Sequence, residues 1–180
     1  MKKQIPLFLI IGLVWLFTMQ MIVLSGKIHP VGYPATVDQE IVSLGDAALK
    51  AGMERPSQKI IKATQIAGEQ TGLSKPFLLC LMWSESSFKP NAVSSRNYRG
   101  LMQVPSYAYC NIFQEDINVL IGARIFMEKL KITKGDYRKA LVLYKGWSLG
   151  DPKGLAQADK VIDLTFKMNK YLPQSGKENL

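Results

Sequence analysis

The chain has few of the residues that a metal site or a disulfide framework requires. Its 180 residues include one histidine and two cysteines, too few ligands for an ordinary metal centre. Cys80 and Cys110 could pair only in an oxidising compartment. However, Cys80 lies in the apolar run 77–83, where a small thiol packs as a core residue. We therefore favour two unpaired thiols over a disulfide and expect no metal site.

Charged residues are absent between Gln4 and Ser25. About 20 apolar residues suffice for a helix that spans a bilayer. By the positive-inside bias, Lys2 and Lys3 before this stretch would stay in the cytoplasm. Residues 23–25 would also serve as a signal-peptide cleavage site, but no cysteine follows for acylation. We favour an uncleaved anchor over a cleaved signal peptide, and both place the rest of the chain outside the cytoplasm.

Acidic residues are fewer than basic ones, 14 against 23, and the net charge is +9. The basic residues are scattered, and no nucleic-acid motif accompanies them, so we expect no nucleic-acid partner. An exported basic domain suits an anionic wall polymer. The same charge is equally typical of ordinary surface solubility.

No stretch of the sequence alternates with the period of two that strands show, which predicts an all-α or nearly all-α fold. The length allows one domain of ordinary size. Thr36 with Gln39 forms a capping-box pattern, and Ser74 is a helix cap. Capping and apolar spacing predict helices over residues 36–52, 57–71, 75–88, 116–131, 136–144 and 159–171, with a small irregular or hairpin segment near 91–98.

The helix predicted over 75–88 contains an apolar run on every face and should lie in the middle of the domain. Glu85 follows that run, with Leu81 and Met82 one turn before it. Burying an ionised carboxylate beside apolar groups is costly, so we expect Glu85 to hold its proton, as a general acid must. If the helix ends near Ser84, Glu85 is instead an ordinary solvated residue.

Residues 83–94, Trp-Ser-Glu-Ser-Ser-Phe-Lys-Pro-Asn-Ala-Val-Ser, and residues 100–103, Gly-Leu-Met-Gln, form the most specific motif. This motif resembles the catalytic signature of the lytic transglycosylases of the soluble-lytic-transglycosylase-like (SLT) family. Residues 118–124 and 143–146 resemble two weaker blocks of the same family, in the same order. The resemblance covers about residues 60 to 147 and implies a lysozyme-like helical fold.

The resemblance also implies a role for each matching residue. Glu85 would be the single catalytic acid and base, with Tyr144 placed to hydrogen-bond or orient it. The residues implied to bind or orient substrate are Ser94, Met102, Gln103 and Tyr144, and those implied to shape the site are Ser86, Gly100, Leu101 and Asn118. Trp147 is a further candidate for substrate binding, because an aromatic face suits a sugar ring. Trp147 is as consistent with packing as with sugar stacking, and Trp83 fits packing better. For Tyr98 and Arg99 two placements are equally consistent with the sequence, facing the glycan or lying in a solvated loop.

Three departures from the family pattern affect the far wall of the implied groove. Lys145 replaces the family's Asn after the Tyr, residues 146–150 replace its Ala-Gly-Pro-Gly turn, and Lys160-Val161 stands for its Tyr-Val pair. The apolar stretch, the helix signals and the resemblance together predict four segments. They are an anchor or signal (1–25), a tether with an accessory helix (26–56), a lysozyme-like catalytic domain (57–172) and a polar tail (173–180).

The implied reaction is cleavage of peptidoglycan between N-acetylmuramic acid and N-acetylglucosamine, with a 1,6-anhydro ring as product and no cofactor. Hydrolases need a second carboxylate, and the candidates Glu115 and Asp116 begin a predicted helix, where acids are ordinary stabilisers. A lysozyme-type hydrolase and a catalytically weak glycan-binding component remain alternatives. The expected partners are peptidoglycan, the membrane, and a secretion, conjugation or phage assembly.

Overall fold

The computed structural model describes residues 37–105 and 111–173. The chain divides into two units after Thr36, and the described residues belong to the unit Val37–Leu180. The predicted anchor, Cys110 and the last seven residues of the predicted tail lie outside the described residues. Within the described part of the chain, no helix has both the length and the apolar character needed to cross a membrane.

The described residues are mainly helical, which confirms the predicted fold class at that level. The helices are α2 (Val37–Ala51), α3 (Gln58–Thr71), α4 (Lys75–Ser86), α5 (Glu115–Ile132), α6 (Tyr137–Tyr144) and α7 (Pro152–Asn169), and the strands are β1 (Tyr98–Arg99) and β2 (Val104–Pro105). Ser57 and Ser74 cap α3 and α4, each accepting a hydrogen bond from a backbone N–H of the first turn. Gly72 ends α3 in the left-handed conformation.

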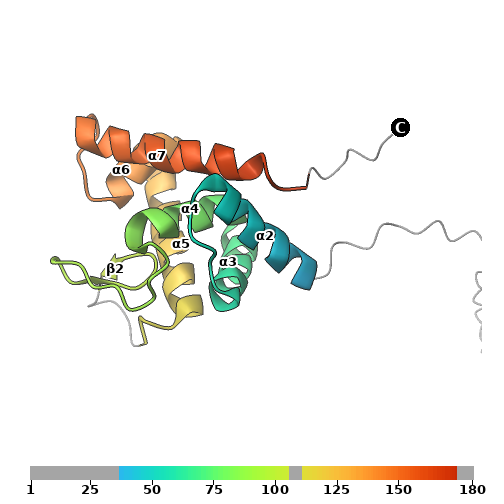
Figure 1. Cartoon of the computed structure of the whole chain (residues 1–180). Coiled ribbons are helices and arrows are strands. Elements are labelled where there is room, and N and C mark those ends of the chain that lie inside the picture. Colours follow the sequence, from blue (N-terminus) through green and yellow to red (C-terminus); the bar gives the residue numbers. More distant parts are fainter. Residues whose placement is uncertain (1–36, 106–110, 174–180) are drawn as a thin grey trace, which may run out of the picture. The chain divides into compact units, whose positions relative to one another are not determined.

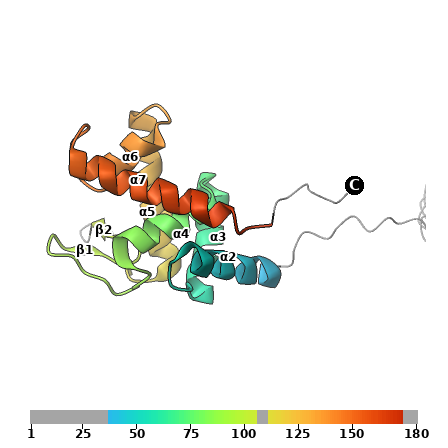
Figure 2. The same ribbon diagram turned by 45° about the horizontal axis from the view of Figure 1, so that its top comes forward.

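Helix α4 is the central element of this unit. Leu78, Leu79, Leu81 and Met82 are fully buried on it, as the all-round apolar run predicted. Figures 1 and 2 show α7 running across α4, with the β1–β2 hairpin at one end of α4 and α2 towards the other. Residues 76–82 of α4 are all buried, and exposed or half-buried residues follow in its last turn, at Trp83, Ser84 and Glu85.

Three predicted boundaries differ from the structure. Helix α7 begins at Pro152 rather than at residue 159, because Asp151 caps it and Pro152 fits its first turn. Helix α4 ends at Ser86 rather than at Phe88, because Ser87 and Phe88 have φ values of 51° and 59°. The hairpin spans 98–105 rather than 91–98, and Val93 joins it only through a single bridge to Arg99.

Candidate active site

Glu85 lies in the last turn of α4, where the helix leaves the core. The hydroxyl of Ser86 is buried and donates to the carbonyl of Met82 at 3.2 Å, so the turn that carries Glu85 is held to the one before it. The next residues reverse the chain in left-handed conformations, and the rings of Trp83 and Phe88 pack with centroids 5.3 Å apart. The helix end therefore presents the carboxyl group from a fixed backbone.

The loop of residues 100–103 faces this helix end and is built around Asn118 on α5. Asn118 is buried, and its side-chain oxygen accepts from the backbone N–H of Met102 at 2.8 Å. Its amide nitrogen donates to the carbonyls of Arg99 and Ile112, at 2.9 and 2.8 Å. One buried amide thus pairs with three backbone groups, one in the loop, one in β1 and one in the segment before α5, which would be costly to leave unpaired.

Gly100 is required by this arrangement. Its φ is +77°, and a Cβ there would stand 2.2 Å from the side-chain nitrogen of Asn118. Any other residue would therefore be strained in its backbone and would displace the buried amide. The Gly100 N–H donates to the carbonyl of Ala92 at 2.8 Å, which ties the loop to the segment that carries Ser94.

A cavity of about 160 Å³ opens between α4, the hairpin and the end of α6. The residues that line it are Glu85, Ser94, Arg96, Tyr98, Gln103, Tyr144, Lys145 and Gly146. Among these lining residues Glu85 is the only carboxylate. The side chain of Glu85 is 15% exposed, so it reaches the cavity but is largely removed from bulk water. We refer to this cavity as the active-site cavity.

Lys145, the residue after α6, reaches Glu85 directly. Its Nζ lies 2.5 Å from the Glu85 Oε1 atom and 2.6 Å from the Ser84 hydroxyl, and its side chain is only 7% exposed. Such a short contact between an ammonium and a carboxylate is a charge-assisted hydrogen bond. The sequence analysis placed Glu85 beside apolar neighbours, and the structure adds a buried cationic partner that the sequence did not predict.

Tyr144 is the last residue of α6, and its hydroxyl donates to the carbonyl of Met102 at 2.7 Å. Burial and the negative charge of Glu85 raise the pKa of Tyr144 well above its usual value. The phenol therefore stays protonated and acts as a donor. Its hydrogen bond holds the 100–103 loop against α6 and does not reach Glu85.

The structure brings together four of the residues that the sequence analysis singled out, Glu85, Ser94, Gln103 and Tyr144, around one cavity. Gln103 also donates from its side chain to the carbonyl of Gly100 at 2.9 Å, which fixes its orientation. Ser94 accepts a hydrogen bond from the Tyr98 backbone. Both residues therefore line the cavity with side chains that are held by local hydrogen bonds.

Two of the side chains predicted to bind or orient substrate, Met102 and Trp147, do not line the cavity. Met102 is fully buried against α5, where a Cβ on Gly122 would stand 2.3 Å from the Cβ of Met102. It contributes its carbonyl to the site and its side chain to the core. Trp147 packs against Gly154 of α7, with its Cβ 2.7 Å from where a Cβ on that glycine would stand. Leu101 is fully buried as well.

Two features of the cavity were not predicted from the sequence. Arg96 lines it, and Lys145 pairs directly with Glu85. Lys145 was noted as a departure from the family pattern, and its place next to Tyr144 was the signal that it would enter the site. Arg96 lies between Ser94 and β1 and belongs to no motif of its own. Arg99 turns away instead and stacks over the ring of Phe113 at 5.6 Å from its centroid.

Comparison with protein families gives one match: residues 62–149 match the family model of the transglycosylase SLT domain. The matched segment runs from α3 to the loop before α7 and contains the whole active-site cavity. The match confirms the family resemblance that the sequence motifs suggested. Neither the curated proteins nor the solved structures gave a match.

Proposed function

We propose that this protein, whose residues 62–149 form a transglycosylase SLT domain, is a lytic transglycosylase that cleaves the glycan strands of peptidoglycan. One observation supports this reaction above all. Glu85 is the only carboxylate among the described residues that line the active-site cavity. Retaining and inverting glycosidases use two carboxyl groups, about 5 to 9.5 Å apart. A site with one carboxyl group suits a reaction in which the substrate supplies the nucleophile.

In the proposed reaction Glu85 gives and then recovers one proton. The neutral carboxylic acid protonates the oxygen between N-acetylmuramic acid and N-acetylglucosamine, and the bond from that oxygen to the muramic C1 breaks. The muramic C6 hydroxyl then bonds to C1, and the Glu85 carboxylate takes its proton. The products are a new glucosamine hydroxyl and a 1,6-anhydro ring, and the reaction consumes no water or cofactor.

The ion pair between Glu85 and Lys145 is then the resting arrangement of the acid. A proton donor must be a neutral carboxylic acid, whereas the pair in the structure joins an ammonium to a carboxylate at 2.5 Å. The pair must therefore open and Glu85 must take up a proton before the glycosidic bond can break. Movement of Lys145 away from Glu85 on substrate binding would accomplish the first step.

Substitution of Glu85 tests the assignment of the acid. Glu85→Gln keeps the shape and the hydrogen-bonding reach of the side chain but cannot transfer the proton, so we expect lysis of purified sacculi to fall by about 100-fold to 10,000-fold. Glu115→Gln and Asp116→Asn, at the start of α5, are matched controls and should keep most activity. Substantial lysis by folded Glu85→Gln, or comparable loss in a control, would refute the assignment.

The same ion pair favours a second candidate function, a glycan-binding component whose acid is held inactive by Lys145. The Lys145→Asn variant distinguishes the two, because it restores the residue expected in the family pattern at this position. A wild-type protein that binds sacculi without cleaving them, together with a cleaving Lys145→Asn variant, would support the second candidate. Cleavage by the wild type supports the first.

We also propose that residues 1–25 anchor the protein in the membrane, with the catalytic domain on the extracytoplasmic side. The support is the uncharged apolar stretch between Gln4 and Ser25, preceded by Lys2 and Lys3. Such an anchor would confine cleavage to the nearby wall, as local opening for a secretion, conjugation or phage machine requires. A mature protein whose sequence begins near Gly26 would overturn the anchor while leaving export intact.

A further inference from the structure

A second and larger cavity lies beside the active-site cavity, along α7. It has a volume of about 660 Å³, within the range of sites that bind small ligands. Its walls come from the end of α2, from α4 and from α7, and Lys145 lines both this cavity and the active-site cavity. We call it the α7 pocket. A ligand in it would lie next to the residue that holds Glu85.

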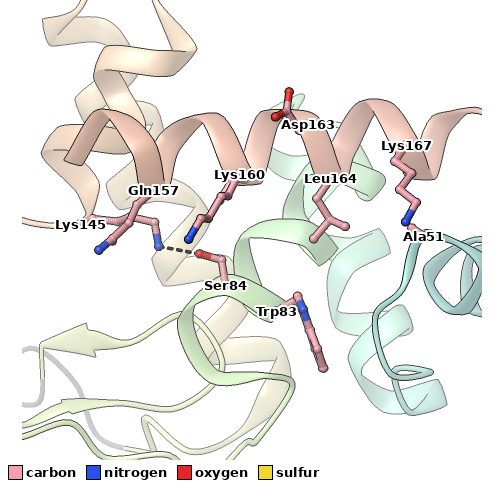
Figure 3. Close-up of a pocket in the computed structure, with 10 residues that line it drawn as sticks. Ala51, Trp83, Ser84, Lys145, Gln157, Lys160, Asp163, Leu164 and Lys167 are labelled. Atoms are coloured by element: carbon pink, nitrogen blue, oxygen red, sulfur yellow. Dashed lines mark hydrogen bonds between the residues drawn. The ribbon is translucent and has the colours of Figure 1, made fainter. Parts of the chain in front are cut away.

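The α7 pocket has a cationic wall. Lys160 projects from α7 towards the end of α4, Lys167 projects from α7 towards the end of α2, and the ammonium of Lys145 enters from the end of α6 (Figure 3). Lys145 is paired with Glu85, whereas Lys160 and Lys167 form no ion pair with any residue in the described part of the chain. The one acidic lining residue, Asp163, directs its carboxylate away from α4 in Figure 3. The pocket is therefore complementary to anionic groups.

The floor of the pocket is apolar. Leu164 points into it from α7, Val161 is buried beneath it, and the ring of Trp83 forms its edge on α4 (Figure 3). A free inorganic anion would leave this surface uncovered. An acidic peptide with small aliphatic side chains would cover it and place its carboxylates against Lys160 and Lys167.

We propose that the α7 pocket binds the acidic peptide stem that muramic acid carries in peptidoglycan. This inference rests on the proposed function, since it names a second part of the same substrate. The stem is attached to the sugar whose C1 is attacked, and the pocket adjoins Glu85 through Ser84 and Lys145. A stem carboxylate in the pocket also offers Lys145 an alternative partner, so peptide binding would free Glu85 for proton transfer.

The cleavage test compares two forms of one substrate, glycan strands that keep their peptides and the same strands after an amidase has removed them. The full chain and a Lys160→Gln, Lys167→Gln double variant are assayed on both. We expect the wild type to prefer the peptide-bearing strands, and the double variant to lose about tenfold of that preference, equivalent to about 1.4 kcal/mol. Lys153→Gln removes the same charge from α7 outside the pocket and should keep the preference.

An unchanged rate ratio in the double variant, or an equal loss on both substrates, would overturn the proposal.

A binding experiment distinguishes failure of this proposal from failure of the proposed function, in which the wild type cleaves neither substrate. There, a synthetic stem tetrapeptide with free carboxylates is titrated against the full chain by calorimetry, beside its amidated form and inorganic phosphate. Binding of the acidic peptide alone, abolished in the double variant, supports the pocket. Equal binding of the acidic and amidated peptides, or of phosphate, refutes it.

Discussion

The ion pair between Lys145 and Glu85 allows a quantitative test on stability. We consider three variants: Lys145→Met, which keeps an unbranched side chain one atom shorter and removes its charge, Glu85→Gln, and the double variant. The pair joins residues 60 positions apart, on α4 and at the end of α6. Its loss should therefore loosen the attachment of α6 to the core helix.

The structure sets the expected size. Two unit charges 2.5 Å apart attract each other by about 7 kcal/mol at an effective dielectric constant of about 20. The cost of removing both from water offsets much of this, so the coupling energy should be about 1 to 3 kcal/mol. Lys145→Met alone should lower the free energy of unfolding by about 3 kcal/mol, because it leaves a charge that is 15% exposed without its partner.

The assay is urea denaturation of the four proteins, followed by circular dichroism, with the coupling taken from the double-mutant cycle. A matched control is the pair Arg138–Asp159, which joins α6 to α7 at 2.6 Å with side chains 47% and 46% exposed. An exposed pair should couple by no more than about 1 kcal/mol. If Lys145 and Glu85 are additive within about 0.5 kcal/mol, the account of the resting site is refuted.

Three further predictions concern residues that support the site. Asn118→Ala leaves three backbone groups unpaired, so the free energy of unfolding should fall by about 3 kcal/mol and cleavage should be lost with it. Denaturation and sacculus lysis measure the two effects, and full stability of the variant would contradict the role of this amide. Gly122→Ala puts a methyl group 2.3 Å from the Cβ of Met102 and should destabilise by about 1 to 3 kcal/mol, measured by thermal unfolding, whereas a neutral effect would show that the loop yields freely. Burial raises the pKa of Cys80 to about 12. In a Cys110→Ser variant the Cys80 thiol should therefore stay protonated from pH 7 to 9 and should react with a disulfide reagent only when the protein unfolds. Rapid labelling of the folded protein would contradict the burial of Cys80.

Much of the fold could be predicted because its signals are local. Ser57 and Ser74 indicate where α3 and α4 begin, and the apolar run on α4 indicates that this helix lies in the centre of the domain. The start of α7 also has a local signal, Asp151 followed by Pro152. The predicted range 159–171 did not include these two residues, although a capping residue followed by proline is typical of a helix start.

The motifs predicted which residues belong to the site, but little about how their side chains are arranged. The spacing of the motifs placed Glu85, Gln103 and Tyr144 around one cavity, but it could not say which way each side chain points. Met102 was expected in the groove and lies in the core, because the absence of a side chain at Gly122 on α5 leaves room for it. Direction depends on tertiary packing, which sequence spacing does not encode.

The contact between Lys145 and Glu85 shows the same limit. Each residue could be singled out in the sequence, one as the acid and the other as a departure from the family pattern. Their meeting depends on how the end of α6 lies against α4, a contact across 60 residues. The apolar neighbours of Glu85 could be identified in the sequence, whereas its cationic partner became visible only in the structure.

The most direct test of the central claim is the chemistry of the cleaved ends. Purified sacculi are digested with the full chain, and the released muropeptides are analysed by mass spectrometry, with the Glu85→Gln variant as the control. If Glu85 works alone and the muramic C6 hydroxyl is the nucleophile, the fragments end in 1,6-anhydromuramic acid and are one water molecule lighter than hydrolysis products. Fragments that carry only reducing ends, absent with the variant, would show that water is the acceptor and would contradict the lytic transglycosylase reaction.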